Sequence, residues 1–180
     1  MRIFNELKAK QREQSLLSKI RSRKITRYPV SFEEARTVGL LFDATDPQHR
    51  NTVRQYAEEL ENKGKEITLF AFLQENEPNS NFVFKHFTKK DLNWFQHPGD
   101  EVISGFINQP FDFLINLYLD QQPALEYVSG LSQAHLRVGP YSEKLHCYDL
   151  MIDTSRQPNL EFFVKHVSYF LNRLKNSSRA

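Results

Sequence analysis

The sequence predicts an α/β fold: a single three-layer, Rossmann-like sandwich with a mostly parallel sheet of five or six strands. Two stretches carry this prediction. Residues 111–117 (Phe-Asp-Phe-Leu-Ile-Asn-Leu) are apolar at most positions, as expected for a strand covered by helices on both faces. Residues 38–72 read as strand, helix and strand, which is typical of a βαβ unit with a right-handed crossover.

The first element is a helix. Residues 3–24 contain neither Pro nor Gly and are rich in helix-forming Leu, Lys, Gln, Glu and Arg. The polar stretch 10–15 interrupts their apolar stripe, which leaves open whether the helix docks on the rest of the chain. Pro29 ends the segment, because proline disfavours a helical residue before it. We expect a basic helical arm over residues 1–28 and the α/β domain over residues 29–180.

The βαβ unit begins with a strand at 38–42. Asp46 offers an N-cap and Pro47 suits the first helical position, while Gly64 supplies the helix end. One helix face is apolar, and it comprises Val53, Tyr56, Ala57 and Leu60. The second strand is expected at 67–72.

The rest of the chain continues this alternation. Thr88 and Asp91 resemble a capping box that opens a helix at 89–95, and Asp120 is expected to cap a later helix. The expected strands are 82–87, 111–117, 136–138 and 147–152, and the expected helices are 123–132 and about 159–175.

Charge is distributed unevenly along the chain, although the net charge is only +2. Residues 1–28 hold nine Lys or Arg and two acidic residues, whereas the rest of the chain is mildly acidic. Such an arm favours contact with RNA, a ribonucleoprotein, an anionic membrane surface or another acidic partner. It is equally compatible with a helix lying on its own acidic domain. The candidate binding residues of the arm are Arg12, Lys19, Arg21, Arg23 and Lys24.

Cysteine use and hydropathy indicate a cytoplasmic protein. Cys147 is the only cysteine, so no intrachain disulfide can form, and its apolar neighbours suggest an inert buried thiol. No apolar run is long enough for a transmembrane helix, and residues 1–10 have no signal-peptide core.

Ligands of open parallel sheets bind beyond the carboxyl ends of the strands, so the acids there are the candidate catalytic residues. Asp46 and Asp120 are accounted for as helix caps. Asp43 and Asp153 have no such role, and they are the candidates for acid–base chemistry or for a divalent cation. Arg137 is a candidate for binding an anion, and it could equally pair with a nearby acid.

Several classes of site are disfavoured. There is no glycine-rich phosphate-binding loop, and the acidic loop 43–46 argues against a dinucleotide enzyme. No two histidines have the spacing of a helical zinc pair and there is no paired cysteine, so a structural zinc site is not expected; no metal-ligating residue is assigned and no cofactor is indicated. His97 and His135 are the two histidines that could face a cleft.

Four blocks of sequence resemble a family of short, uncharacterised bacterial proteins of the Bacteroidota type, a domain of unknown function. The blocks are 87–95, 106–117, 131–139 and 148–152. A fainter likeness is to the N-terminal domain of heptosyltransferase-type glycosyltransferases, from which this chain departs in lacking a Gly-Asp turn and a second domain. Neither resemblance implies an activity here.

Two functional hypotheses follow. The first is a non-catalytic binding or interaction protein, whose basic arm contacts nucleic acid, a ribonucleoprotein or a protein partner. The alternative is a small-ligand or Mg-dependent enzyme with its site at the carboxyl ends of the strands.

Overall fold

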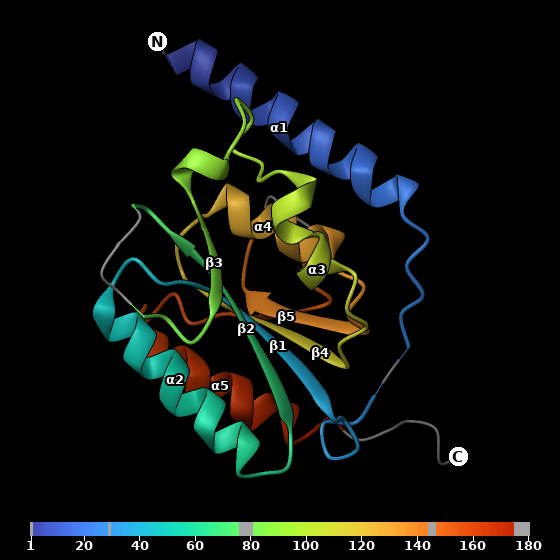
Figure 1. Ribbon diagram of the computed structural model, residues 1–180, viewed down its shortest axis with the longest axis vertical. Coiled ribbons are helices and arrows are strands. Elements are labelled where there is room, and N and C mark those ends of the chain that lie inside the picture. The colour runs from blue at the N-terminus through green and yellow to red at the C-terminus, as the bar shows by residue number, and fades with distance from the viewer. Residues whose placement is uncertain (1, 29, 76–80, 144–146, 175–180) are drawn as a thin grey trace.

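The computed structural model describes residues 2–28, 30–75, 81–143 and 147–174. Its centre is one six-stranded sheet with the order β3-β2-β1-β4-β5-β6, and every pairing is parallel (Figure 1). The strands are β1 (Thr37–Asp43), β2 (Glu66–Leu73), β3 (Lys85–Thr88), β4 (Phe113–Leu117), β5 (Leu136–Pro140) and β6 (Leu150–Ile152). The α/β prediction is confirmed.

Helices cover both faces of the sheet and produce two apolar cores. The α2 helix (Pro47–Glu61) and the α5 helix (Leu160–Leu171) cover one face, and α3 (Asp100–Ile107) and α4 (Pro123–Leu131) cover the other (Figure 1). Burial from both sides explains why four of the five residues of β4 are apolar, since all five are buried; the exception, Asn116, donates to the Val138 carbonyl at 2.8 Å.

The strand order reverses between β1 and β4. From β1 the chain moves outward through β2 to β3, then crosses back to β4 and continues through β5 to β6 on the other side. In doubly wound sheets this reversal opens a crevice beyond the carboxyl ends of the two central strands. The loops after β1 and β4 therefore meet where a ligand site is expected.

The N-terminal segment forms α1 (Arg2–Ser22), which lies outside α3 and α4 (Figure 1). Leu16 is 3% exposed and belongs to the core beneath α4, and Ile20 packs against the same core. Gly130 permits this contact, because a Cβ there would come within 2.9 Å of the Ile20 Cδ1 methyl. The helix of the basic arm thus docks on the domain and adds a layer to one side of the sandwich.

The structure departs from three local expectations. The α3 helix was not predicted, although Asp100 and Glu101 at its start and the apolar spacing that follows are helix signals. The capping box of Thr88 and Asp91 is present, but it opens only the 3-10 turn η1 (Lys89–Asp91). Asp120 does not cap α4, whose N-cap is Gln122, so of the two aspartates expected to cap helices only Asp46 is confirmed.

Candidate functional site

Two adjoining cavities lie at the carboxyl end of β4 and share Gln121 and Glu126 in their lining. One, of about 130 Å³, is roofed by α1, and we call it the inner cavity. The other, of about 230 Å³, lies toward the loop after β5, and we call it the outer cavity. Both occupy the edge of the sheet at which parallel α/β proteins bind ligands.

Glu126 is the central residue of this site. It belongs to the first turn of α4, a helix whose residues 124–131 are all buried, and it is only 6% exposed. Its backbone amide bonds the Gln122 carbonyl, but its carboxyl forms no hydrogen bond or ion pair with any described residue. Burial raises the pKa of its carboxyl to about 7, with the charge of Arg12 opposing the shift and that of Glu13 adding to it. A buried carboxyl that titrates near neutral pH marks a candidate functional group.

The inner cavity brings two further unsatisfied polar atoms to Glu126. Arg12 on α1 bonds Gln96 through Nη1 at 2.8 Å, but its Nε is buried without a partner. His97 is 3% exposed and its Nε2 also has no partner. Both residues line the cavity together with Glu126. A buried polar atom without a hydrogen-bond partner reduces the stability of the folded protein. Two such atoms in one cavity therefore indicate a binding site for a polar group.

His97 is held as a neutral imidazole. Its ring stacks on Tyr127, with 4.0 Å between ring centroids. Burial, aided by the nearby charges of Lys19 and Arg12, lowers the pKa of His97 to about 4. At neutral pH it can therefore offer one donor and one acceptor without adding charge to the site.

The outer cavity contains a pair of buried phenols. The hydroxyls of Tyr118 and Tyr148 lie 2.7 Å apart, and burial is the main cause that raises the pKa of each above its ordinary value. Only one hydroxyl hydrogen can occupy the bond between them, so the other remains available to a ligand. Gly139 makes room for this pair, because a Cβ there would come within 2.5 Å of the Tyr148 ring.

The structure does not bring the two predicted catalytic aspartates together. They follow β1 and β6, and β4 and β5 lie between these strands. Three strand spacings separate them by roughly 14 Å. Asp43 accepts bonds from the Thr45 amide and from Gln122 Nε2, which tie the two central loops to each other.

Asp153 is exposed and accepts a bond from the Ser155 amide at 2.9 Å, which lowers the pKa of its carboxyl. It lines neither cavity of the site. Among the described residues no group of three or more His, Cys, Asp and Glu side chains is arranged to hold a metal ion.

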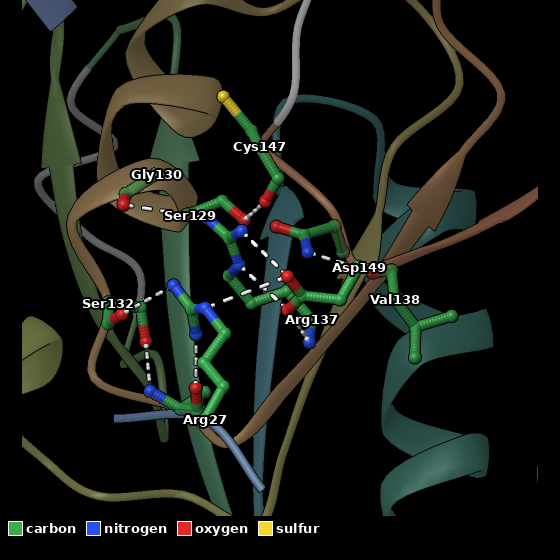
Figure 2. Close-up of polar contacts among 10 residues, drawn as sticks. Arg27, Ser129, Gly130, Ser132, Arg137, Val138, Cys147 and Asp149 are labelled. Carbon is green, nitrogen blue, oxygen red and sulfur yellow. Dashed lines mark hydrogen bonds and ion pairs between the residues drawn. The ribbon is translucent and has the colours of Figure 1, made fainter. Parts of the chain in front are cut away.

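Arg137 lies inside the protein and pairs with an acid. It is 5% exposed, and its Nε and Nη2 donate to the two carboxylate oxygens of Asp149 at 3.0 and 2.9 Å (Figure 2). Arg27 approaches the same carboxylate from the segment after α1. Burial opposes ionisation of Asp149, but these hydrogen bonds and charges lower its pKa overall. Of the two roles considered for Arg137, pairing with a local acid is the one observed.

Three of the candidate cations of the arm bind the domain. Arg12 bonds Gln96, Arg23 bonds Asn108 at 2.7 Å, and Lys19 contacts the Tyr127 hydroxyl. Arg21 and Lys24 are exposed, with no bond to another described side chain. The helix therefore uses its inner face for docking and keeps basic residues on its outer face.

The strand order and the cavities at the carboxyl ends of the strands define a doubly wound α/β protein of the Rossmann type. The sequence matches, over residues 8–174, the model of a family of unknown function (DUF6913), and the chain belongs to that family. The matched region includes most of α1. No curated protein matches the sequence. The family assignment confirms the expected domain of unknown function, and it adds neither a source organism nor a relationship to glycosyltransferases.

Sequence reasoning missed Glu126, although a signal for it was present. The residue is the single charge within 123–131, a helix that is otherwise apolar or small. Acidic residues are seldom buried in apolar helices, so a lone acid there is a candidate for a functional site. His97 was correctly singled out as facing a cavity, whereas its proximity to Arg12 and Glu126 depends on tertiary contacts.

Proposed function

We propose that this protein binds a small carboxylate ligand in the inner cavity and that Glu126 exchanges a proton with it. The observation that carries the proposal is that Arg12 Nε and His97 Nε2, both buried without a hydrogen-bond partner, line one cavity with the Glu126 carboxyl, which forms no hydrogen bond with a described residue. The proposal develops the small-ligand alternative from the sequence and replaces Asp43 and Asp153 by Glu126 as its proton-transfer group.

The chemistry of these groups suits an anion with several acceptor lone pairs. Arg12 donates through Nε–H, and His97 donates in the tautomer that carries hydrogen on Nε2. Glu126 donates as well when it is protonated, which its pKa of about 7 allows at neutral pH. A carboxylate would accept from all three, and the Arg12 charge would compensate its own.

Glu126 is also suited to general acid–base catalysis, which is most efficient when the catalytic pKa lies near the working pH. The Tyr118–Tyr148 pair supplies a hydroxyl donor on the side of the outer cavity. We therefore propose proton transfer on a small carboxylate as the reaction class.

Isothermal titration with acetate and with pyruvate, at pH 6 and pH 8, tests this proposal. Binding that needs protonated Glu126 should be about tenfold weaker at pH 8 than at pH 6. Glu126→Gln keeps a donor and should bind with little pH dependence, while Arg12→Gln should bind weakly at both values. Lys10→Gln is the matched control, because Lys10 is an exposed cation of α1 outside the cavity. Lack of saturable binding, or the same pH dependence in Glu126→Gln, contradicts the proposal.

A second candidate function is binding of RNA or a ribonucleoprotein by the outer face of α1 and the residues that directly follow it. The observation that favours it is the exposure of Lys10, Arg21 and Lys24 after α1 has docked. Fluorescence anisotropy with a labelled RNA over a salt series tests it, since phosphate contacts weaken steeply with salt. The triple change to Gln should abolish binding and leave the fold intact. Equal binding by the variant would rule out this surface.

We also propose that the protein acts in the cytoplasm. Cys147 is buried and free, and a reducing compartment would keep it so. In the part of the chain that the structure describes, no helix is both long and apolar enough to span a bilayer.

A further inference from the structure

A third groove, of about 470 Å³, lies at the carboxyl end of β2 and beside the start of α4. We call it the Trp94 groove, after the exposed tryptophan in its wall. Gln122 lines it and also bonds Asp43, which places the groove next to the reversal of strand order between β1 and β4. Its volume falls in the range of small-molecule sites, about 300–1,000 Å³.

The charge of the Trp94 groove favours an anion. Lys8 from α1 and Lys89 from η1 both line it, and its lining includes no Asp or Glu among the residues that the structure describes. The acid closest in sequence to Lys89 is Asp91, which is already bound by the Thr88 amide and hydroxyl at 2.7 and 3.0 Å. Two cations with no lining acid are suited to a phosphate group.

The groove also offers a surface for a flat ring. Trp94 is 69% exposed, and the Lys8 ammonium lies 4.0 Å from the centre of its ring. Indole rings stack on planar heterocycles, and a nearby cation does not prevent stacking on the open part of the ring. The side-chain amides of Gln74, Asn93 and Gln122 line the same space and can each donate and accept hydrogen bonds.

From these features we propose that the Trp94 groove binds a nucleoside monophosphate. The base stacks on Trp94 and the amides bond its edge, while Lys8 and Lys89 bind the phosphate. The sequence argument against a dinucleotide concerned a glycine-rich loop after β1, and this site uses side chains instead of such a loop. It adjoins the inner cavity, with which it shares Pro123 in its lining, but the inference does not depend on the function proposed for Glu126.

Titration with AMP followed by tryptophan fluorescence tests this inference, because Trp94 is the only tryptophan in the chain. Stacking should quench its emission with a saturable dependence on AMP. Adenosine and inorganic phosphate are titrated separately, and each should bind at least tenfold more weakly than AMP. Adenosine lacks the phosphate that the lysines bind, and phosphate lacks the base that stacks on Trp94.

Two neighbouring lysines provide a matched pair of variants. Lys89→Gln should weaken AMP binding about tenfold through loss of a charged hydrogen bond. Lys90→Gln should leave it unchanged, because Lys90 is exposed on the same turn but does not line the groove. Trp94→Ala, followed by calorimetry, should bind AMP no better than phosphate.

The result that would overturn the inference is absence of saturable quenching by AMP, or equal effects of Lys89→Gln and Lys90→Gln. Equal affinity for AMP and phosphate would contradict the role of Trp94 and leave an anion site of another kind. Glu126→Gln should bind AMP normally, so failure at this groove and failure at the inner cavity are distinguished.

Discussion

Glu126 is held in an environment that disfavours its charged form. Its carboxyl lies beneath α1, with Arg12 as the opposing cation, Glu13 as a second acid, and His97 lining the same cavity. On the other side, Glu126 helps to raise the pKa values of Tyr118, Tyr148 and Cys147. A buried carboxyl reduces the stability of the folded protein, and an apolar residue at this position would not. A functional role explains why a carboxyl is present here.

This burial predicts how stability depends on pH. The pKa of Glu126 is about 7 in the folded state and 4.5 in the unfolded state, so the folded protein binds the proton more tightly. Its effect on stability is therefore most favourable below pH 4.5 and is lost as the pH rises through 7. The loss amounts to roughly 3 kcal/mol. Glu126→Gln should lack this component and be more stable than the wild type at pH 8, as measured by urea unfolding.

Glu161→Gln is the matched control, because Glu161 also occupies the first turn of a helix but is exposed. It should follow the wild-type curve. His97 contributes the opposite slope between about pH 4 and 6.5, and it is present in every protein compared. If Glu126→Gln and the wild type change in parallel from pH 5 to pH 8, the carboxyl does not titrate near neutrality.

Two residues show why site roles could not be predicted fully from the sequence. Arg137 has a nearby acid in Asp149, but the sequence does not show that β5 and the residue before β6 bring them together. Asp120 stands near a helix start, yet α4 begins only at Pro123 with Gln122 as its N-cap. Both outcomes depend on where the backbone turns, which residue types alone do not fix.

At the scale of elements, the decisive contact is between α1 and α4. Leu16 and Ile20 approach the backbone of α4 at Gly130, and Lys19 reaches Tyr127 on the same helix. This docking could not be predicted from the sequence, because the apolar stripe of α1 is interrupted. Arg12, Lys19 and Arg23, which the sequence suggested as partner-binding residues, form hydrogen bonds with the domain.

Two Gly→Ala substitutions test this contact, because they should change the free energy of unfolding in opposite directions. Gly130→Ala should destabilise the protein by about 1 kcal/mol, because the new Cβ displaces the end methyls of Ile20 and Leu16. Gly105→Ala on α3 should stabilise it by about 0.5–1 kcal/mol, since nothing lies within 4 Å and alanine favours the helix. Urea unfolding measures both. Equal stabilisation by the two changes would mean that α1 does not pack on Gly130.

At the scale of the whole molecule, the α/β fold could be predicted because its signals are local. The mostly apolar sequence of β4 and the strand–helix–strand pattern from β1 to β2 both indicate a parallel sheet. The inner cavity could not, because Arg12, His97 and Glu126 are far apart in the sequence. They meet only after α1 has crossed over α4 and the segment before α3 has folded beneath it.

The most direct test of this account is the titration of the Glu126 carboxyl itself. In the 13C-labelled protein its carboxyl resonance is assigned by its absence from Glu126→Gln. The account predicts a midpoint near pH 7, which moves to higher pH in saturating acetate because the ligand prefers the protonated form. A midpoint near 4.5, unchanged by acetate, would contradict both the buried state of this carboxyl and its proposed role.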